Sequence, residues 1–215
     1  MKPRQPAILC LLSSALCLLT LAGCNILPPV QADTTRYYVL TGPAPGGSGA
    51  PSLGGALRLG LKAVEVAPYL KKGSLVVRTG DNEVAFPTDA RWAEPLDQEI
   101  ARTLRLRLLA APAVGRVFVA PFPLDEKRDF EVSVQVLHCE GVREGGSGAR
   151  ARFEALLEIT TAGSNGRVGA RKNFLAPDAA CDGKDFARLA ALLSDAVGAL
   201  AQEVAGALPE KKPTD

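Results

Sequence analysis

Residues 130–139 read FEVSVQVLHC, and apolar side chains recur at every second position. Successive side chains of a β-strand point to opposite faces, so this period of two predicts a strand with one apolar face. The polar face carries Glu131, Ser133 and Gln135, together with Leu137 and Cys139. The apolar face carries Phe130, Val132, Val134, Val136 and His138. We therefore expect this strand to bury one side against a core.

The segments that follow predict two partner strands. Residues 152–159 alternate in the same way and place Phe153, Ala155, Leu157 and Ile159 on one face. A glycine-rich connection at 145–148 separates this segment from the first strand, and turn-forming residues at 163–166 lead into a last strand at 167–174. These three segments predict a meander.

Two amphipathic helices are expected to pack on the sheet. In residues 184–208, apolar side chains recur at spacings of three and four. A second helix begins at Glu94-Pro95, because proline suits the first helical turn, and ends near Ala111. Shorter strands are expected at 36–40, 57–67, 74–79, 83–86 and 116–120. The pattern predicts a single domain of the α/β (α+β) class, with a mixed, mostly antiparallel sheet packed by two main helices.

The first residues predict a secreted, lipid-anchored protein. Lys2 and Arg4 precede a short apolar run, as in a secretory signal peptide of residues 1–23. Leu21-Ala22-Gly23-Cys24 resembles the bacterial lipobox, which makes Cys24 the predicted lipid attachment site. We expect residues 24–34 to form a lipidated tether, 35–208 the folded domain and 209–215 a polar tail. In the lipoprotein sorting pattern, the absence of aspartate at position 25 indicates the outer membrane, with the domain facing the periplasm.

Composition narrows the classes of function. The chain of 215 residues has 25 Lys+Arg and 23 Asp+Glu, and removal of Lys2 and Arg4 leaves 25 − 2 = 23 against 23. A neutral domain lacks the charge that nucleic-acid binding requires. The one histidine, His138, comes without a nucleophile elbow, a zinc signature or a phosphate-binding loop. We therefore expect no catalytic residue, metal or cofactor.

After removal of Cys10 and Cys17 with the signal peptide, and acylation of Cys24, two cysteines remain. In an oxidising compartment, Cys139 and Cys181 are expected to form a disulfide, and two buried free thiols are the alternative.

Several motifs, taken together, point to a known family. They are VEVAPYL at 64–70, LVVRT at 75–79, Glu83 and RWAEPL at 91–96, with YVL at 38–40, the lipobox and the late helix. This order resembles the PqiC-type family, the ABC-type transport auxiliary lipoprotein component. RWAEPL is the most specific part. The glycine-rich loop at 42–56 and the two late cysteines depart from the family pattern.

The resemblance implies a homo-oligomeric, non-enzymatic outer-membrane lipoprotein that works with an MCE-domain protein and inner-membrane transporter components in lipid transport. The candidate docking residues are Tyr69, Arg78, Arg91, Trp92 and Glu94. Each also has a structural interpretation: Trp92 as core, Glu94 at a helix start, Tyr69 at a strand end, and either arginine paired with Glu83 or Glu94. A self-contained periplasmic lipid-binding carrier and an envelope hydrolase dependent on His138 are the rival functions.

Overall fold

The computed structural model describes residues 32–42, 55–143, 148–163 and 166–208. One compact unit begins at Thr35 and contains every helix and strand described below. The predicted signal peptide, Cys24, the polar tail and most of the 42–56 loop lie outside the described residues.

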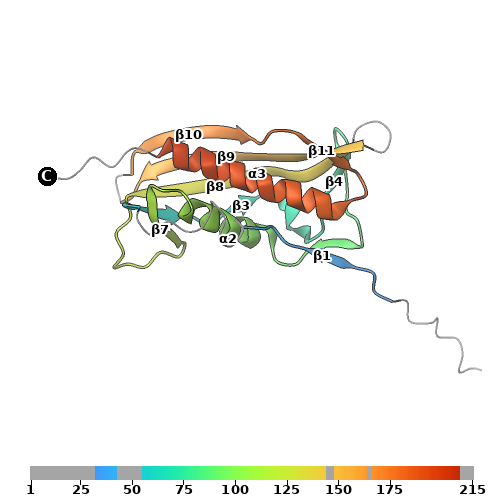
Figure 1. Ribbon diagram of the computed structural model, residues 1–215, viewed down its shortest axis with the longest axis horizontal. Helices are drawn as coiled ribbons and strands as arrows, with labels where there is room; N and C mark the ends of the chain where they lie inside the picture. Colours follow the sequence, from blue (N-terminus) through green and yellow to red (C-terminus); the bar gives the residue numbers. More distant parts are fainter. Residues whose placement is uncertain (1–31, 43–54, 144–147, 164–165, 209–215) are drawn as a thin grey trace, which may run out of the picture. The chain divides into compact units, whose positions relative to one another are not determined.

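The main sheet is built around three long strands. β8 (Phe130–Arg143), β9 (Gly148–Thr161) and β10 (Val168–Leu175) form an antiparallel meander. β11 (Ala179–Asp182) pairs with the start of β9. The order β10-β9-β8-β2-β7 continues through β2 (Leu57–Leu61) to β7 (Val114–Val119). In Figure 1, β10 and β7 lie on opposite sides of β9 and β8.

Short parallel strands line the other side of β8. β2, β3 (Glu65–Val66) and β4 (Val77–Gly80) pair with β8 one after another, and β5 (Glu83–Ala85) forms a hairpin with β4. The mixed sheet is confirmed, and it contains more parallel pairing than the sequence indicated. Helix α2 makes the parallel β2–β7 pairing possible, because parallel neighbours need a long crossover connection.

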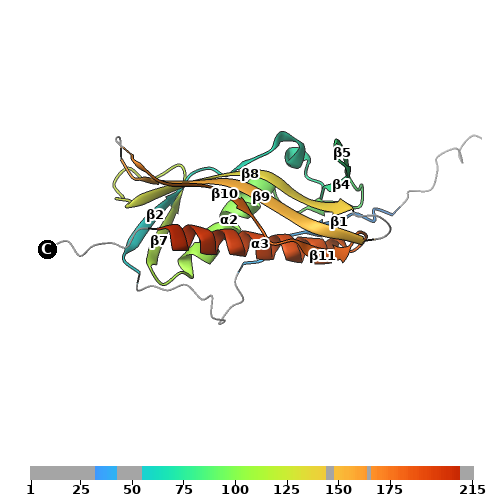
Figure 2. The same cartoon turned by 90° about the horizontal axis from the view of Figure 1, so that it is seen from above.

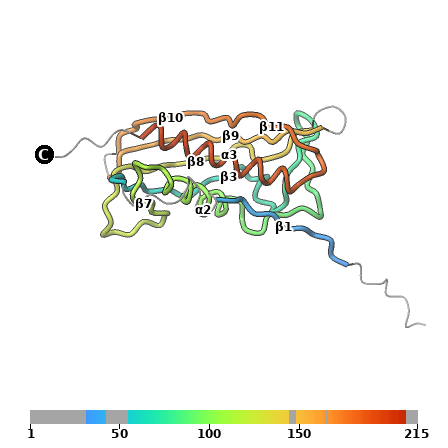
Figure 3. Tube along the Cα trace, in the orientation of Figure 1, coloured from blue at the N-terminus to red at the C-terminus, as the bar shows by residue number. Residues whose placement is uncertain are grey.

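Two helices pack together on one face of the sheet. α2 (Leu96–Leu109) and α3 (Phe186–Ala207) contact each other, and α3 runs along β8 and β9 (Figures 2 and 3). Inward-facing side chains of β9, such as Phe153 and Leu157, are buried against them. α3 is long and apolar enough to cross a membrane, but most of its apolar stretch is buried in this core. Its hydrophobicity is accounted for by packing.

The N-terminal segment is fastened to both helices. β1 (Arg36–Tyr38) runs parallel to β6 (Ala90–Trp92) in a separate two-stranded sheet. The Leu40 amide then donates to buried Glu99 of α2 at 3.0 Å, and the Thr41 amide donates to Ser194 of α3 at 3.0 Å. These two contacts connect the segment that contains β1 directly to the core.

Most predicted elements are found close to their expected bounds. The strands at 36–40, 74–79, 83–86 and 116–120, the meander and both helices are confirmed. The strand expected at 57–67 is divided into β2 and β3, at the place where its alternation slips by one residue. β6, β11 and the 3₁₀ helix η2 (Pro68–Lys72) were not predicted, because segments this short carry no readable period.

A β-bulge in β8 corrects the predicted position of His138. The register with β9 shifts between Val136 and His138, so one residue is inserted and the alternation reverses beyond it. Cys139 is buried in the core instead, and His138 lies half-buried on the opposite face. The prediction that His138 lies on the apolar face is therefore wrong.

The register also contradicts the predicted disulfide. Cys139 of β8 pairs with Phe153 of β9, whereas Cys181 of β11 pairs with Ala149 on the other edge of β9. Two strand spacings and four residues along β9 separate their Cα atoms by roughly 16 Å. A disulfide requires less than about 7 Å. Both side chains are free thiols, and burial raises the pKa of each.

Candidate functional site

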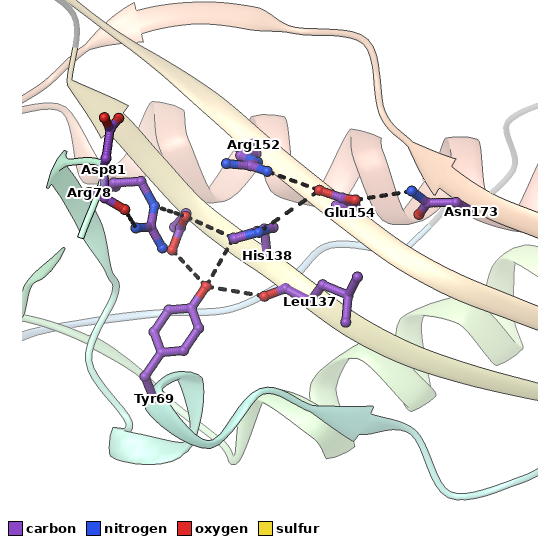
Figure 4. Close-up of polar contacts among 9 residues, drawn as sticks. Tyr69, Arg78, Asp81, Leu137, His138, Arg152, Glu154 and Asn173 are labelled. Carbon is purple, nitrogen blue, oxygen red and sulfur yellow. Dashed lines mark hydrogen bonds and ion pairs between the residues drawn. The ribbon is translucent and has the colours of Figure 1, made fainter. Parts of the chain in front are cut away.

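Two of the predicted docking residues meet in a polar cluster on the sheet face away from the helices. Tyr69 comes from η2 and Arg78 from β4, and both reach Glu140 of β8. η2 and β4 lie beside the second half of β8, which brings residues far apart in the sequence to one place (Figure 4). The bulge in β8 turns His138 and Glu140 towards them.

Glu140 is the centre of this cluster and is fully buried. One carboxylate oxygen accepts from Arg78 Nε at 2.7 Å and lies 3.1 Å from His138 Nδ1. The other accepts from the Tyr69 hydroxyl at 2.8 Å. The same hydroxyl lies 3.2 Å from His138 Nδ1 and 3.1 Å from the Leu137 carbonyl oxygen. The buried charge is therefore compensated by a cation and a hydroxyl donor.

A second carboxylate extends the cluster across β9 towards β10. Glu154 lies 3.9 Å from His138 Nε2, accepts from Arg152 at 3.0 Å, and accepts from the Asn173 amide at 3.1 Å (Figure 4). The chain of contacts thus crosses β4, β8, β9 and β10 on the open face. His138 is the connection between the two carboxylates.

The electrostatics of the cluster make it a poor centre for acid–base chemistry. Burial, followed by the hydrogen bond to Glu140, raises the pKa of the Tyr69 phenol well above its usual value. The hydrogen bond to Glu140 also raises the pKa of Arg78. Hydrogen bonds from Asn173 and Arg152 lower the pKa of Glu154. At neutral pH the phenol is therefore a neutral donor, and Glu140 has no surface through which to reach a substrate.

A groove of about 570 Å³ adjoins the cluster on the same face. Its lining includes Asn173, which also binds Glu154, and Leu156, which is 41% exposed. Lys62, Glu65, Glu158 and Arg171 supply charges of both signs around that leucine. An exposed apolar side chain ringed by charges is typical of a protein contact surface.

The other predicted docking residues lie elsewhere. Trp92 of β6 is buried in the core at 5% exposure, which fits its structural interpretation. Glu94 precedes α2 and lies 3.6 Å from Arg102 of that helix. Arg91 of β6 is half-buried beside β1, and its guanidinium lies next to Gly73. The structure therefore brings together Tyr69 and Arg78 but not the remaining three.

Sequence reasoning missed the carboxylates that organise these contacts. Glu140 and Glu154 were not singled out, and Arg78 was expected to pair with Glu83 or with a partner protein. Glu140 lies beyond the bulge, so no alternation pattern marks it as a buried acid. Glu99 is likewise hidden, because it occupies an ordinary position in the first turns of a helix.

Among the described residues, no three His, Cys, Asp or Glu side chains gather as a metal site requires. His138 lies between two carboxylates, and its nearer partner already binds Arg78 and Tyr69. The cluster thus connects η2 and β4 to β8, and its polar groups are already occupied by one another.

Comparison with known proteins places this geometry in context. A family model described as the ABC-type transport auxiliary lipoprotein component matches residues 38–205. The crystal structure of protein XCC0632 from Xanthomonas campestris, of family DUF330, is similar with a TM-score of 0.65 and 19% identity, and covers 80% of this chain and 93% of that one. A crystal structure of an uncharacterized protein has a TM-score of 0.57 and 20% identity, with 80% and 97% covered. At 19% and 20% identity, these two comparisons show that the chain shares its fold with both proteins. No curated protein matches the sequence at the significance required.

Proposed function

Because this chain belongs to the ABC-type transport auxiliary lipoprotein component family, we propose that it is a lipid-anchored, non-catalytic subunit of an MCE-type intermembrane lipid transport system. In this proposal, Cys24 carries the acyl chains and holds a homo-oligomer at the periplasmic face of the outer membrane. The folded domain docks the periplasmic lipid conduit, and inner-membrane transporter components complete the system. The observation that carries the proposal is the family match across residues 38–205.

The open face of the sheet supports a docking role. Its groove combines exposed Leu156 with charges of both signs, and the Glu140 cluster beside it is internally satisfied. A rigid, satisfied polar cluster keeps a contact surface in one shape, which lowers the cost of binding. We therefore assign the conduit contact to the face formed by β8, β9 and β10. Tyr69 and Arg78 support this face through Glu140.

The alternative of a self-contained lipid carrier is less well supported. A carrier needs a concave, mostly apolar cavity that encloses an acyl chain. The groove on the open face is lined by Lys62, Glu65, Glu158 and Arg171 as well as Leu156. Charged walls of this kind favour a protein contact over a buried hydrocarbon chain.

The direct test is a mild-detergent purification of the full-length, acylated protein from its own membranes, with co-purifying proteins identified by mass spectrometry. We expect an MCE-domain protein, and we expect its yield to fall at least about tenfold with Leu156→Asp. Leu124→Asp is the matched control, because Leu124 is fully exposed and does not line the groove. If no MCE-domain protein is captured even after cross-linking, the docking proposal fails. A stoichiometric lipid in the acyl-free protein would favour the carrier instead.

The anchor has a separate test. We expect mass spectrometry of the membrane-purified protein to find acyl chains on an N-terminal Cys24. Cys24→Ser should release the protein into the soluble fraction, because the acyl chains supply the stable membrane attachment. Density-gradient separation of the two membranes should place the acylated protein with the outer membrane. A Cys24→Ser protein that stays with the membranes would contradict an anchor at this residue.

A further inference from the structure

A group of basic side chains near β1 lacks the carboxylate partners found elsewhere in the fold. Along the sheet, Arg78 pairs with Glu140 and Arg171 pairs with Glu158. Within the described part of the chain, no carboxylate lies at ion-pair distance from Lys71, Lys72 or Arg91. Lys72 packs its ammonium over the Phe86 ring, 4.3 Å from the ring centroid. These charges are therefore available to an external anion.

Three adjoining backbone segments bring these residues together. Tyr37 of β1 is in register with Arg91 of β6. On the other side of β6, Arg91 forms a bridge with Ser74, and the Trp92 amide donates to the Gly73 carbonyl oxygen at 2.9 Å. The Arg91 guanidinium covers Gly73, since a Cβ built there would lie 3.3 Å from Nη2. Lys71 and Lys72, the last residues of η2, directly precede that glycine.

Exposed apolar side chains lie beside these charges. Tyr37 is 62% exposed and Val39 is 47% exposed, whereas Leu40 is buried and Tyr38 packs against Phe186. The alternation places Tyr37 and Val39 together on the outer side of the segment. We call Tyr37, Val39, Lys71, Lys72 and Arg91 the β1 patch.

The charge of this surface is positive. Segments 35–40, 68–75 and 88–94 contain four basic residues, Arg36, Lys71, Lys72 and Arg91, against the acidic residues Asp89 and Glu94, and Glu94 pairs with Arg102 of α2. Lysine and arginine beside an exposed tyrosine suit the boundary between water and a phospholipid bilayer, where phosphates meet the first methylene groups.

The position of the patch in the chain identifies the occupant, given the anchor in the proposed function. Residues 25–35 separate Cys24 from Arg36 and span at most about 40 Å. The patch is built on the first strand after that tether. A short tether gives the surface nearest to its attachment point the highest local concentration at the bilayer.

We propose that the β1 patch is a bilayer-contact surface that binds the phosphate groups of anionic phospholipids in the membrane carrying the acyl anchor. Arg91, Lys71 and Lys72 contact the phosphates, and Tyr37 and Val39 reach the interfacial region. This contact orients the folded domain relative to the membrane.

The test uses the chain from residue 24 onward with Cys24→Ser, so that no acyl group contributes to binding. Vesicles of phosphatidylethanolamine and phosphatidylglycerol in equal parts are compared with vesicles of phosphatidylcholine by flotation on a density gradient. We expect binding to the phosphatidylglycerol vesicles, and a drop of at least about tenfold in the partition coefficient when Lys72→Glu and Arg91→Glu are combined. Lys127→Glu with Arg167→Glu is the matched control, because both side chains are exposed and lie next to strands of the main sheet, outside the separate sheet that contains β1.

A second pair of variants tests the patch without Arg91→Glu, so that the result does not depend on the folding of that variant. Tyr37→Ser should weaken binding to the phosphatidylglycerol vesicles several-fold, while Leu124→Ser should leave it unchanged, and circular dichroism checks the fold of each protein. Three results would overturn the bilayer-contact proposal. They are absence of vesicle binding, equal binding to both vesicle types, and an equal loss of binding with the control pair. Loss of the MCE-domain protein on patch reversal with unchanged vesicle binding would assign the patch to a protein instead. Failure of the vesicle test leaves the conduit purification unaffected, so the two proposals can fail separately.

Discussion

Glu140 shows how one buried carboxylate can position two residues that a sequence motif marks as functional. Tyr69 and Arg78 belong to motifs that suggest a docking role, yet their polar groups are directed at Glu140. Their contribution is to fix η2 and β4 against β8. The motifs contain two residues of the cluster, and the three-dimensional structure shows that both contact Glu140.

Replacement of Glu140 tests this role. Glu140→Gln removes the charge that Arg78 and Tyr69 surround, and we expect it to lower the free energy of unfolding by about 2–4 kcal/mol. Urea unfolding followed by Trp92 fluorescence measures the effect. Glu203→Gln is the control, because its ion pair with Lys172 is exposed and should contribute less than about 1 kcal/mol. An equal effect of both variants would refute a special role for Glu140.

Two other carboxylates, Glu99 and Glu154, are expected to change the stability of the fold with pH in opposite directions. Burial raises the pKa of Glu99, so its protonated form is favoured by folding. Its stabilising contribution is therefore largest in acid and declines as the pH rises above about 4.5. Hydrogen bonds from Asn173 and Arg152 lower the pKa of Glu154, so its contribution is present at neutral pH and is lost as the pH falls below about 4.5.

The measurement compares each glutamine variant with the parent chain by urea unfolding between acidic and neutral pH. From acid to neutral pH, the stability of the parent relative to Glu99→Gln should fall. Relative to Glu154→Gln it should rise. Slopes of the same sign for both variants would contradict the environments described for these residues.

At the scale of elements, the long strands and helices could be predicted because their periods extend over many residues. β8, β9, β10, α2 and α3 each repeat their pattern several times. The bulge in β8 could not be predicted, because one inserted residue leaves both flanking patterns intact and only shifts their phase. That shift moved His138 to the open face and hid Glu140. The short strands β6 and β11 form through pairing with their neighbours.

The register of β8, β9 and β11 predicts that both late cysteines remain reduced. When the protein is denatured in iodoacetamide without reductant, we expect full alkylation of Cys139 and Cys181. In the native protein Cys181 should react much faster, because Cys139 is 1% exposed and burial raises its pKa. Peptide mass spectrometry gives both results. A linked Cys139–Cys181 peptide would contradict this register.

At the scale of the whole molecule, the compact unit that begins at Thr35 contains both sheets and both helices. The candidate site shows the limit of prediction at this scale. Tyr69, Arg78, Glu140 and Glu154 come from four elements, and no local pattern encodes their meeting. The family motifs contain Tyr69 and Arg78, whereas Glu140 and Glu154 are recognised as their partners only in the folded structure.

A single unit predicts cooperative unfolding. Urea transitions measured by Trp92 fluorescence and by far-ultraviolet circular dichroism should coincide, because β6 packs Trp92 into the same core as the helices. A chain that begins at residue 35 should match one that begins at residue 24 within about 1 kcal/mol. Separate midpoints for the two probes would indicate independent units.

The amides of Leu40 and Thr41, held by Glu99 and Ser194, give the molecule a mechanical property. In the proposed arrangement, in which the domain is anchored to the membrane and docked to a partner, tension acts through the first residues of the domain. Such a pull acts first on the pairing of β1 with β6 and then on the contacts of Leu40 and Thr41 with the two helices. β1 can therefore be pulled away from β6 on its own, whereas unravelling beyond it must break a contact to each helix, so these two contacts protect the core.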